Sequence, residues 1–200
     1  MKLYYSPLAC SLAPHFVANE AGVALELVKV DLRTKKTAAG RNYVDINPLG
    51  YVPLLELDDG VLLTEAQVIC QYLADLKPAS GLMPPAGQIA RYRTQAWLAF
   101  VSTEVHKPMG SMFHKLPQET LDSTRSKLAQ RLAYVDEHLA GKSYLMGDAF
   151  TAPDAYLWTV LNWAGMVKFD LSPYPNIAAF QAKVAARPAL QQALKEEGVA

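Results

Sequence analysis

The feature that most constrains the fold is a change of pattern on either side of a segment rich in proline and glycine, KPASGLMPPAG at residues 77–87. Before this segment, runs that alternate as strands do are interleaved with runs of helical periodicity. After it, apolar residues recur only at helical spacing. A segment of this composition is typical of a linker. We therefore expect an α/β unit over residues 1–77, a linker over 78–87 and an all-helical unit over 88–200.

The α/β unit is expected to have the element order β-α-β followed by β-β-α. Its second strand places Val28, Val30 and Leu32 on one face. Gly22 suits the C-cap of the first helix, and Asp59-Gly60 is a hairpin signal. The expected elements are a strand at 2–5, a helix at 11–21, a strand at 25–32, a hairpin over 52–64 and a helix at 65–77.

The helical unit contains one segment that is apolar nearly all round, DAYLWTVLNWAGMV at residues 154–167. It is too short to span a membrane, so we expect the buried central helix of a bundle. Thr151 and Asp154 at its start match a capping box, with Pro153 in the first turn. Two further helices are expected, one through Ile89, Arg93, Trp97, Phe100 and Glu104, and one through Leu121, Leu128, Leu132, Val135 and Leu139.

Composition excludes several classes of function. Hydrophobic residues make up 51% and charged residues 19%, which indicates a well-packed globular protein. Lys+Arg and Asp+Glu number 19 each, so the net charge is zero and nothing attracts nucleic acid or anionic lipid over long range. No apolar run is long enough to span a bilayer. No continuous apolar stretch follows Lys2, so we expect a cytoplasmic protein without a secretory signal.

The cysteines and histidines also limit the possibilities. Cys10 and Cys70 do not make a disulfide framework, and a reducing compartment fits them. The four histidines show no paired spacing with cysteine, so we expect no structural zinc site. Cys70 lies on the apolar stripe of its helix and is expected in the core.

Cys10 lies where a strand-like run gives way to a helix-like run. If Ser11 begins the helix, the Cys10 sulfur lies near N-terminal amides that stabilise an anion, so its pKa should fall. That would make Cys10 a nucleophile or a thiolate clamp. A small buried hydrophobic residue is the alternative, because free cysteine is often buried. The residues alone leave both possibilities open.

Two further motifs suit a peptide-like ligand. A cis bond at Val52–Pro53 would turn the Val52 backbone toward an extended ligand, although an ordinary proline at a strand start also fits. Thr64 and Gln67 match a capping box, which would leave the Ala66 amide for a carboxylate and Glu65 for an ammonium. Simple capping, without a ligand, is the alternative reading of that helix start.

The segment FVSTEVHKPMG carries a histidine on a predicted helix. Thr103 and His106 are three residues apart and are expected to share a helix face, with Ala99 one turn earlier. His106 could bond a thiolate or donate a proton. A structural or solvated histidine is the alternative. Pro108 is expected to bend the helix there.

Taken together and in this order, the motifs resemble the glutathione S-transferase superfamily, and within it the bacterial beta class. The resemblance spans essentially the whole chain. It rests on MKLYYSPLACSLAPH, DLRTKKT, INPLGYVPLL, LTEAQVICQYLAD, TEVHK, GDAFTAPDAYL and ARPALQQAL. It implies an α/β thioredoxin-like N-terminal domain plus an all-α helical-bundle C-terminal domain, a homodimer, and glutathione as cosubstrate without a metal.

The resemblance also implies roles, matched by position, for the glutathione site. Cys10 would face the glutathione sulfur and could form a mixed disulfide with it, and Lys35 would meet the glycine carboxylate. The Val52 backbone would pair with the cysteinyl moiety, and Glu65 with Ala66 would hold the γ-glutamyl group. The implied glutathione-binding residues are Cys10, Lys35, Val52, cis-Pro53, Glu65, Ala66, Thr103, Glu104, Val105, His106 and Lys107.

The helical unit is implied to close the site through residues 103–107. His106 and Lys107 would lie near the sulfur, which makes Cys10 and His106 the expected catalytic residues. Glu104 could serve its own site or that of the partner subunit. The acceptor pocket is expected to be apolar. Its candidate residues, which could equally be core, are Met109, Met112, Phe113 and Trp163.

The leading hypothesis is a glutathione S-transferase that conjugates glutathione to small apolar electrophiles. A thiol redox enzyme or reductive dehalogenase that uses Cys10 is the second. A non-catalytic protein that binds glutathione or an apolar ligand is the third. Two departures from the class bear on the site. Ala99 replaces the usual asparagine, and Leu8 replaces the usual glycine beside Cys10.

Overall fold

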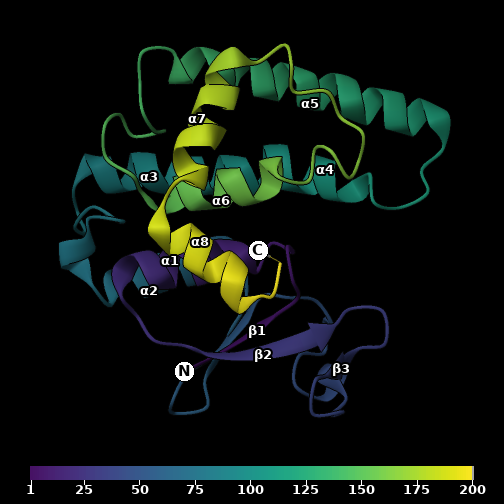
Figure 1. Ribbon diagram of the computed structural model, residues 1–200, viewed down its shortest axis with the longest axis vertical. Coiled ribbons are helices and arrows are strands. Elements are labelled where there is room, and N and C mark those ends of the chain that lie inside the picture. The colour runs from purple at the N-terminus through teal and green to yellow at the C-terminus, as the bar shows by residue number, and fades with distance from the viewer. Residues whose placement is uncertain (200) are drawn as a thin grey trace. The chain divides into compact units, whose positions relative to one another are not determined.

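The structure is a computed structural model that describes residues 1–199. The chain forms two compact units (Figure 1). The first comprises Met1–Leu82 together with the C-terminal segment that starts at Arg187, and the second comprises Met83–Ala186. The last helix therefore belongs to the first unit. The sequence pattern had placed it in the helical unit predicted for residues 88–200.

The first unit is built on a mixed sheet with the strand order β3-β2-β1-β4-β5. β1 pairs in parallel with β2, and the other neighbours are antiparallel. In β1, Leu3 lies opposite Leu27 of β2 on one side and Leu55 of β4 on the other. The strands are β1 (Lys2–Tyr5), β2 (Glu26–Asp31), β3 (Lys36–Thr37), β4 (Leu54–Glu56) and β5 (Leu62–Leu63).

Three helices of the first unit pack with one another. They are α1 (Leu12–Ala21), α2 (Ala66–Asp75) and α8 (Pro188–Glu196), and α1 contacts both of the others (Figure 1). α1 ends where predicted, because Gly22 adopts the left-handed conformation with φ 69° and its N–H caps the last turn. Short 3-10 turns occur at Tyr43–Asp45 and Pro78–Ser80.

The predicted apolar face of β2 is confirmed. Val30 is buried in a cluster, against which Val28 and Leu32 pack. This cluster includes Val52 and Leu54, so it also supports the chain where the candidate site residues lie. The buried members are Tyr4, Val30, Tyr43, Ile46, Val52 and Leu54.

The second unit is helical throughout its regular elements. These are α3 (Ile89–Phe100), the π-helical segment Val101–His106, α4 (Lys107–Ser111), α5 (Gln118–Leu139), α6 (Ala152–Leu161) and α7 (Pro175–Ala185). All ten residues of α6 are buried, which confirms the expected central helix. The capping box of Thr151 and Asp154 is present at its start.

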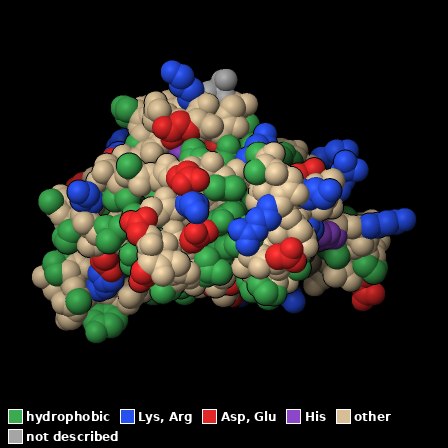
Figure 2. Space-filling view, turned by 90° about the horizontal axis from the view of Figure 1, so that it is seen from below, with side chains coloured by type: hydrophobic (Ala, Val, Ile, Leu, Met, Phe, Trp, Pro, Cys, Tyr) green, Lys and Arg blue, Asp and Glu red, His purple; other side chains and the backbone are tan. Residues whose placement is uncertain are grey.

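The surface agrees with the balanced composition. On the face drawn in Figure 2, acidic and basic side chains both occur, with hydrophobic side chains between them. Within residues 1–199, every helix falls short of the length and apolar character that crossing a membrane requires.

Candidate active site

Cys10 lies in the loop that joins β1 to α1. The loop is held by a backbone bond from Ala9 N to Ser6 O (3.0 Å) and by the buried Ser11 hydroxyl, which accepts from Ser6 N (3.1 Å). Ser11 is the N-cap of α1, as the sequence suggested. The Cys10 thiol donates to the carbonyl of Val52 at 3.2 Å. Cys10 is therefore fixed beside the chain that precedes Pro53.

The expected lowering of the Cys10 pKa is wrong for this structure. Cys10 as a residue is partly exposed, but desolvation of its sulfur raises the pKa of the thiol to about 12, and the nearby charge of Glu65 also raises it. The backbone amides of Cys10 and Ser11 act in the predicted direction, but their effect is smaller than that of burial. The thiol is consequently protonated at neutral pH, which agrees with its role as donor to Val52. Cys70 is buried, as predicted, and burial raises its pKa as well.

Residues 50–52 bring the candidate residues of the first unit together. Besides the bond from Cys10 to Val52, Lys35 Nζ donates to Gly50 O at 2.7 Å. The Tyr51 hydroxyl donates to Glu65 Oε1 at 2.9 Å. The Val52–Pro53 bond is cis, as the resemblance implied. We call Gly50, Tyr51 and Val52 the 50–52 segment.

The start of α2 differs in detail from the prediction. The helix begins at Ala66, and Glu65 is the N-cap, without a side-chain cap bond. The capping box predicted for Thr64 and Gln67 is therefore wrong, because the helix starts one residue later than that box requires. The Ala66 N–H lies in the first turn, whose amides have no acceptor within the helix. The Ala66 amide, which suits a carboxylate, is therefore still next to the Glu65 side chain, which suits an ammonium.

Leu8, two residues before Cys10, has a strained backbone that a distant residue supports. Its φ is 58°, a conformation that favours glycine. Its N–H donates to Glu197 Oε2 at 2.9 Å. Glu197 is 3% exposed and also contacts Nδ1 of the buried His15 at 3.2 Å, and Nε2 of His15 is 2.7 Å from Glu196 Oε2. The C-terminal segment thus helps to hold the loop of Cys10.

We expect Leu8→Gly to raise the free energy of unfolding by about 0.5–1 kcal/mol, because glycine relieves the left-handed strain and loses only part of that gain to chain entropy. Urea denaturation would measure the change. Leu49→Gly is the matched control, since Leu49 is 62% exposed and is not among the residues with positive φ. It should destabilise the protein. Equal effects of the two substitutions would contradict the prediction.

In the helical unit, His106 lies within an aromatic cluster. Its Nδ1 is 2.5 Å from the hydroxyl of the buried Tyr156, and its ring centroid is 5.0 Å from that of Trp163. Phe113, which is 50% exposed, packs edge-on against Trp163 at 5.6 Å. Of the acceptor candidates, Trp163 therefore contacts His106 but is buried at 6% exposure, as the core alternative expects, and Phe113 is the exposed ring that packs on Trp163.

The other acceptor candidates are placed differently. Met109 has no exposed surface and is part of the core of the helical unit, so it does not line an open pocket. Met112 is partly exposed at the end of α4. The core alternative is thus the correct one for Met109.

The predicted shared face of Thr103 and His106 is wrong. Residues 101–106 form a π-helical segment, whose bonds join residues five apart, so a spacing of three no longer aligns side chains. Thr103 and Lys107 instead line a pocket of about 250 Å³ with Thr124 and Lys127 of α5. α4 restarts at Lys107 with Pro108 in its first turn, where a missing N–H is tolerated.

The remaining residues of the 103–107 segment have partners in their own unit. Glu104 forms an ion pair with Arg131 of α5, with 2.6 Å between Oε2 and Nε. Val105 is buried. The Thr103 hydroxyl donates to the carbonyl of Ala99 at 3.0 Å. The Thr103 hydroxyl is therefore engaged within its own helix. It does not take the place of the asparagine side chain that the class usually has at position 99.

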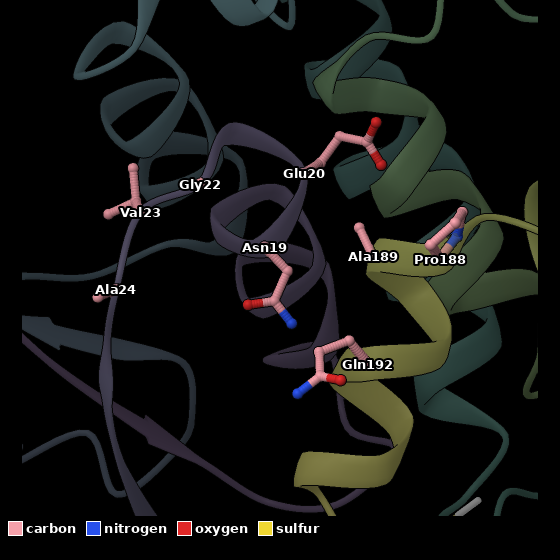
Figure 3. Close-up of a pocket in the computed structure, with 8 residues that line it drawn as sticks. All are labelled: Asn19, Glu20, Gly22, Val23, Ala24, Pro188, Ala189 and Gln192. Atoms are coloured by element: carbon pink, nitrogen blue, oxygen red, sulfur yellow. The ribbon is translucent and has the colours of Figure 1, made fainter.

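An open groove of about 680 Å³ lies between α1 and α8 of the first unit, and none of the predicted site residues lines it (Figure 3). Asn19 and Gln192 project into it from the two helices. Glu20 at its edge forms an ion pair with Arg187, so its charge is already balanced. The groove holds no nucleophile. Within residues 1–199, no three His, Cys, Asp or Glu side chains are grouped as metal ligands.

Comparison with known proteins agrees with this geometry. Residues 9–76 match the family model of the glutathione S-transferase N-terminal domain, and residues 95–188 match that of the C-terminal domain. Glutathione S-transferase GstA of Escherichia coli O157:H7 is 46% identical over 200 residues, with both chains covered completely.

Two solved structures are similar over the whole length. The sphingomonad glutathione S-transferase complexed with glutathione has a TM-score of 0.94 at 43% identity, and both chains are covered completely. The bacterial beta-class glutathione S-transferase of Sphingomonas chungbukensis has a TM-score of 0.95 at 40% identity, with the same coverage. The chain therefore belongs to the bacterial beta class of the glutathione S-transferase family, and it is a transferase that uses glutathione as cosubstrate.

Proposed function

We propose that the protein conjugates glutathione to small apolar electrophiles, and that the 50–52 segment is the centre of its glutathione site. The observation that carries this proposal is the convergence of three chemically distinct groups on that segment. Cys10, Lys35 and Glu65 are each bonded to it. The Lys35 ammonium suits the glycine carboxylate, the Val52 backbone suits the cysteinyl moiety, and Glu65 suits an ammonium.

In this proposal the reacting sulfur belongs to glutathione. Cys10 is a protonated thiol, so when glutathione binds its S–H can turn from the Val52 carbonyl to the bound thiolate and thereby favour ionisation of glutathione. The glutathione sulfur attacks the electrophilic carbon, a carbon–sulfur bond forms, and the leaving group departs with its electron pair. The thiol proton is released to solvent. The raised pKa of Cys10 counts against the redox alternative, which needs Cys10 as a thiolate.

We assign the electrophile and the second catalytic residue to the helical unit. His106 is proposed to donate a hydrogen bond to the glutathione thiolate, and the buried hydroxyl of Tyr156 holds its ring. Phe113 is the proposed source of apolar surface, and it packs on the buried Trp163, which in turn packs on the His106 ring. Thr103, Glu104, Val105 and Lys107 remain assigned to glutathione through the family resemblance.

We further propose a homodimer that works in the cytoplasm. The helical unit exposes a cluster of rings on α3 and α5, in which Trp97, Phe100 and Tyr134 lie within 5.8 Å of one another by centroid. These rings line a pocket of about 380 Å³. Exposed aromatic clusters of this kind favour burial against another protein surface. The free cysteines fit a reducing compartment.

We expect Cys10→Ala to slow conjugation of a chloronitrobenzene acceptor about tenfold without abolishing it, because the hydrogen bond that is lost is made to the charged glutathione thiolate and such bonds contribute about 1.5–3 kcal/mol. The same variant should not accelerate the reduction of a glutathionyl mixed disulfide above the uncatalysed rate. Both rates would be measured at millimolar glutathione. Absence of conjugation by the unmodified protein would contradict the proposed function, and loss of conjugation only in the variant would make Cys10 itself the nucleophile.

A further inference from the structure

We propose that Tyr51 is a positioning residue that orients the Glu65 carboxylate toward the ammonium of the γ-glutamyl group of glutathione. The inference rests on the proposed function, because it concerns the same glutathione site. It starts from the bond of 2.9 Å between the Tyr51 hydroxyl and Glu65 Oε1. Nothing in the sequence pattern pointed to this tyrosine.

The backbone of Tyr51 is anchored from the interior of the first unit. Its carbonyl accepts from the Tyr43 hydroxyl and from Asn47 Nδ2, each at 2.9 Å. Tyr43 is completely buried, and Asn47 is 3% exposed. The Tyr51 side chain, in contrast, is 39% exposed. The hydroxyl is therefore carried to the surface from a fixed base.

The backbone of Glu65 is also fixed. Its carbonyl accepts from Val68 N and Ile69 N, each at 2.9 Å, in the first turn of α2. Its φ of 68° and ψ of 114° are far from helical values, so the side chain leaves the chain in a direction that a helical residue would not give. With both backbones held, the bond between the two side chains restricts the carboxylate to a narrow range of orientations.

A phenol is well suited to this task. A carboxylate has about four acceptor positions, so one bond from Tyr51 leaves several for an ammonium. Because the hydroxyl is neutral, it orients Glu65 without cancelling the negative charge that attracts the ammonium, which a lysine or arginine partner would do. Burial and the bond to Glu65 raise the pKa of Tyr51, so it stays a donor at neutral pH. A carboxylate oriented in advance loses less side-chain entropy when the ligand binds.

The test compares glutathione with its analogue that lacks the γ-glutamyl amino group, glutaryl-cysteinylglycine. We expect Tyr51→Phe to raise the Kd for glutathione about fivefold and to leave the Kd for the analogue unchanged. The value of kcat at saturating glutathione should not change. In a Glu65→Gln background, Tyr51→Phe should have no further effect, because the charge that it orients is gone. Tyr92→Phe is the matched control, since Tyr92 is 57% exposed on α3.

Other outcomes overturn the inference. If Tyr51→Phe weakens both ligands equally, its role is structural. If it changes neither affinity, or raises only the pKa of the bound glutathione thiol, the hydroxyl does not act through Glu65. If the unmodified protein binds neither ligand in calorimetry, the proposed function itself fails, and the inference falls with it. If the unmodified protein binds both ligands, the proposed function stands, and a failed prediction for Tyr51→Phe then contradicts the inference alone.

Discussion

Replacement of Asp154 by alanine should lower the free energy of unfolding by about 3 kcal/mol, since it removes a buried carboxylate and leaves its donors without acceptors. Asp154 has no exposed surface. Its Oδ1 accepts from Leu145 N, and its Oδ2 accepts from Thr151 N and from the Thr151 hydroxyl, each at 2.8 Å. It thereby caps α6, the fully buried helix of the second unit, and ties the preceding loop to it.

Urea denaturation followed by circular dichroism would measure the change. Asp170→Ala is the matched control, because Asp170 bonds Ser172 in a similar local turn but is exposed. We expect the control to cost less than about 1 kcal/mol. If the two variants lose the same stability, burial of the capping box is not what stabilises the helical unit.

Features of the fold that depend on residues close together in the sequence were predictable. The capping box, the Gly22 cap and the hairpin at Asp59-Gly60 each depend on residues within a few positions of one another, and each is present in the structure. Helical periodicity identified α3 and α5 for the same reason, and a continuous apolar run identified α6. The two-residue strand β3 carries too little pattern to be recognised.

The candidate site was predictable in part. Local motifs singled out Cys10, Val52 and Glu65 with alternatives left open, and the family resemblance added Lys35; all four are bonded to or lie in the 50–52 segment of the structure. What remained hidden depends on contacts between distant positions. The bond from Leu8 to Glu197 spans 189 residues. No local pattern could have revealed it.

Quantities that depend on burial were also beyond the sequence. The position of Cys10 before a helix predicted a lowered pKa, and the amides that justify this prediction are present. Desolvation, which a sequence does not display, is the larger effect and reverses the direction. In the helical unit, the π-helical winding at 101–106 changed which side chains share a face. A spacing rule for α-helices could not anticipate it.

Cys10 should react with iodoacetamide about 100-fold more slowly than a free cysteine at pH 7.5. A pKa of about 12 leaves a far smaller thiolate fraction than the ordinary value of about 8.5, and the greater nucleophilicity of a more basic thiolate recovers only part of that loss. Because the folded pKa is raised, the rate should climb about tenfold per pH unit from pH 6 to 9.5 without a plateau.

Peptide mass spectrometry would follow Cys10 and Cys70 separately, and the same chain in urea supplies the control in which both thiols are exposed. Glutathione, if it occupies the proposed site, should slow the alkylation of Cys10 further by covering it, while the rate of Cys70 stays unchanged because that thiol is buried within the first unit. A plateau near pH 7 would instead mean that Cys10 is ionised in the folded protein. The amides at the start of α1 would then outweigh burial, and Cys10 would be competent to attack a disulfide itself.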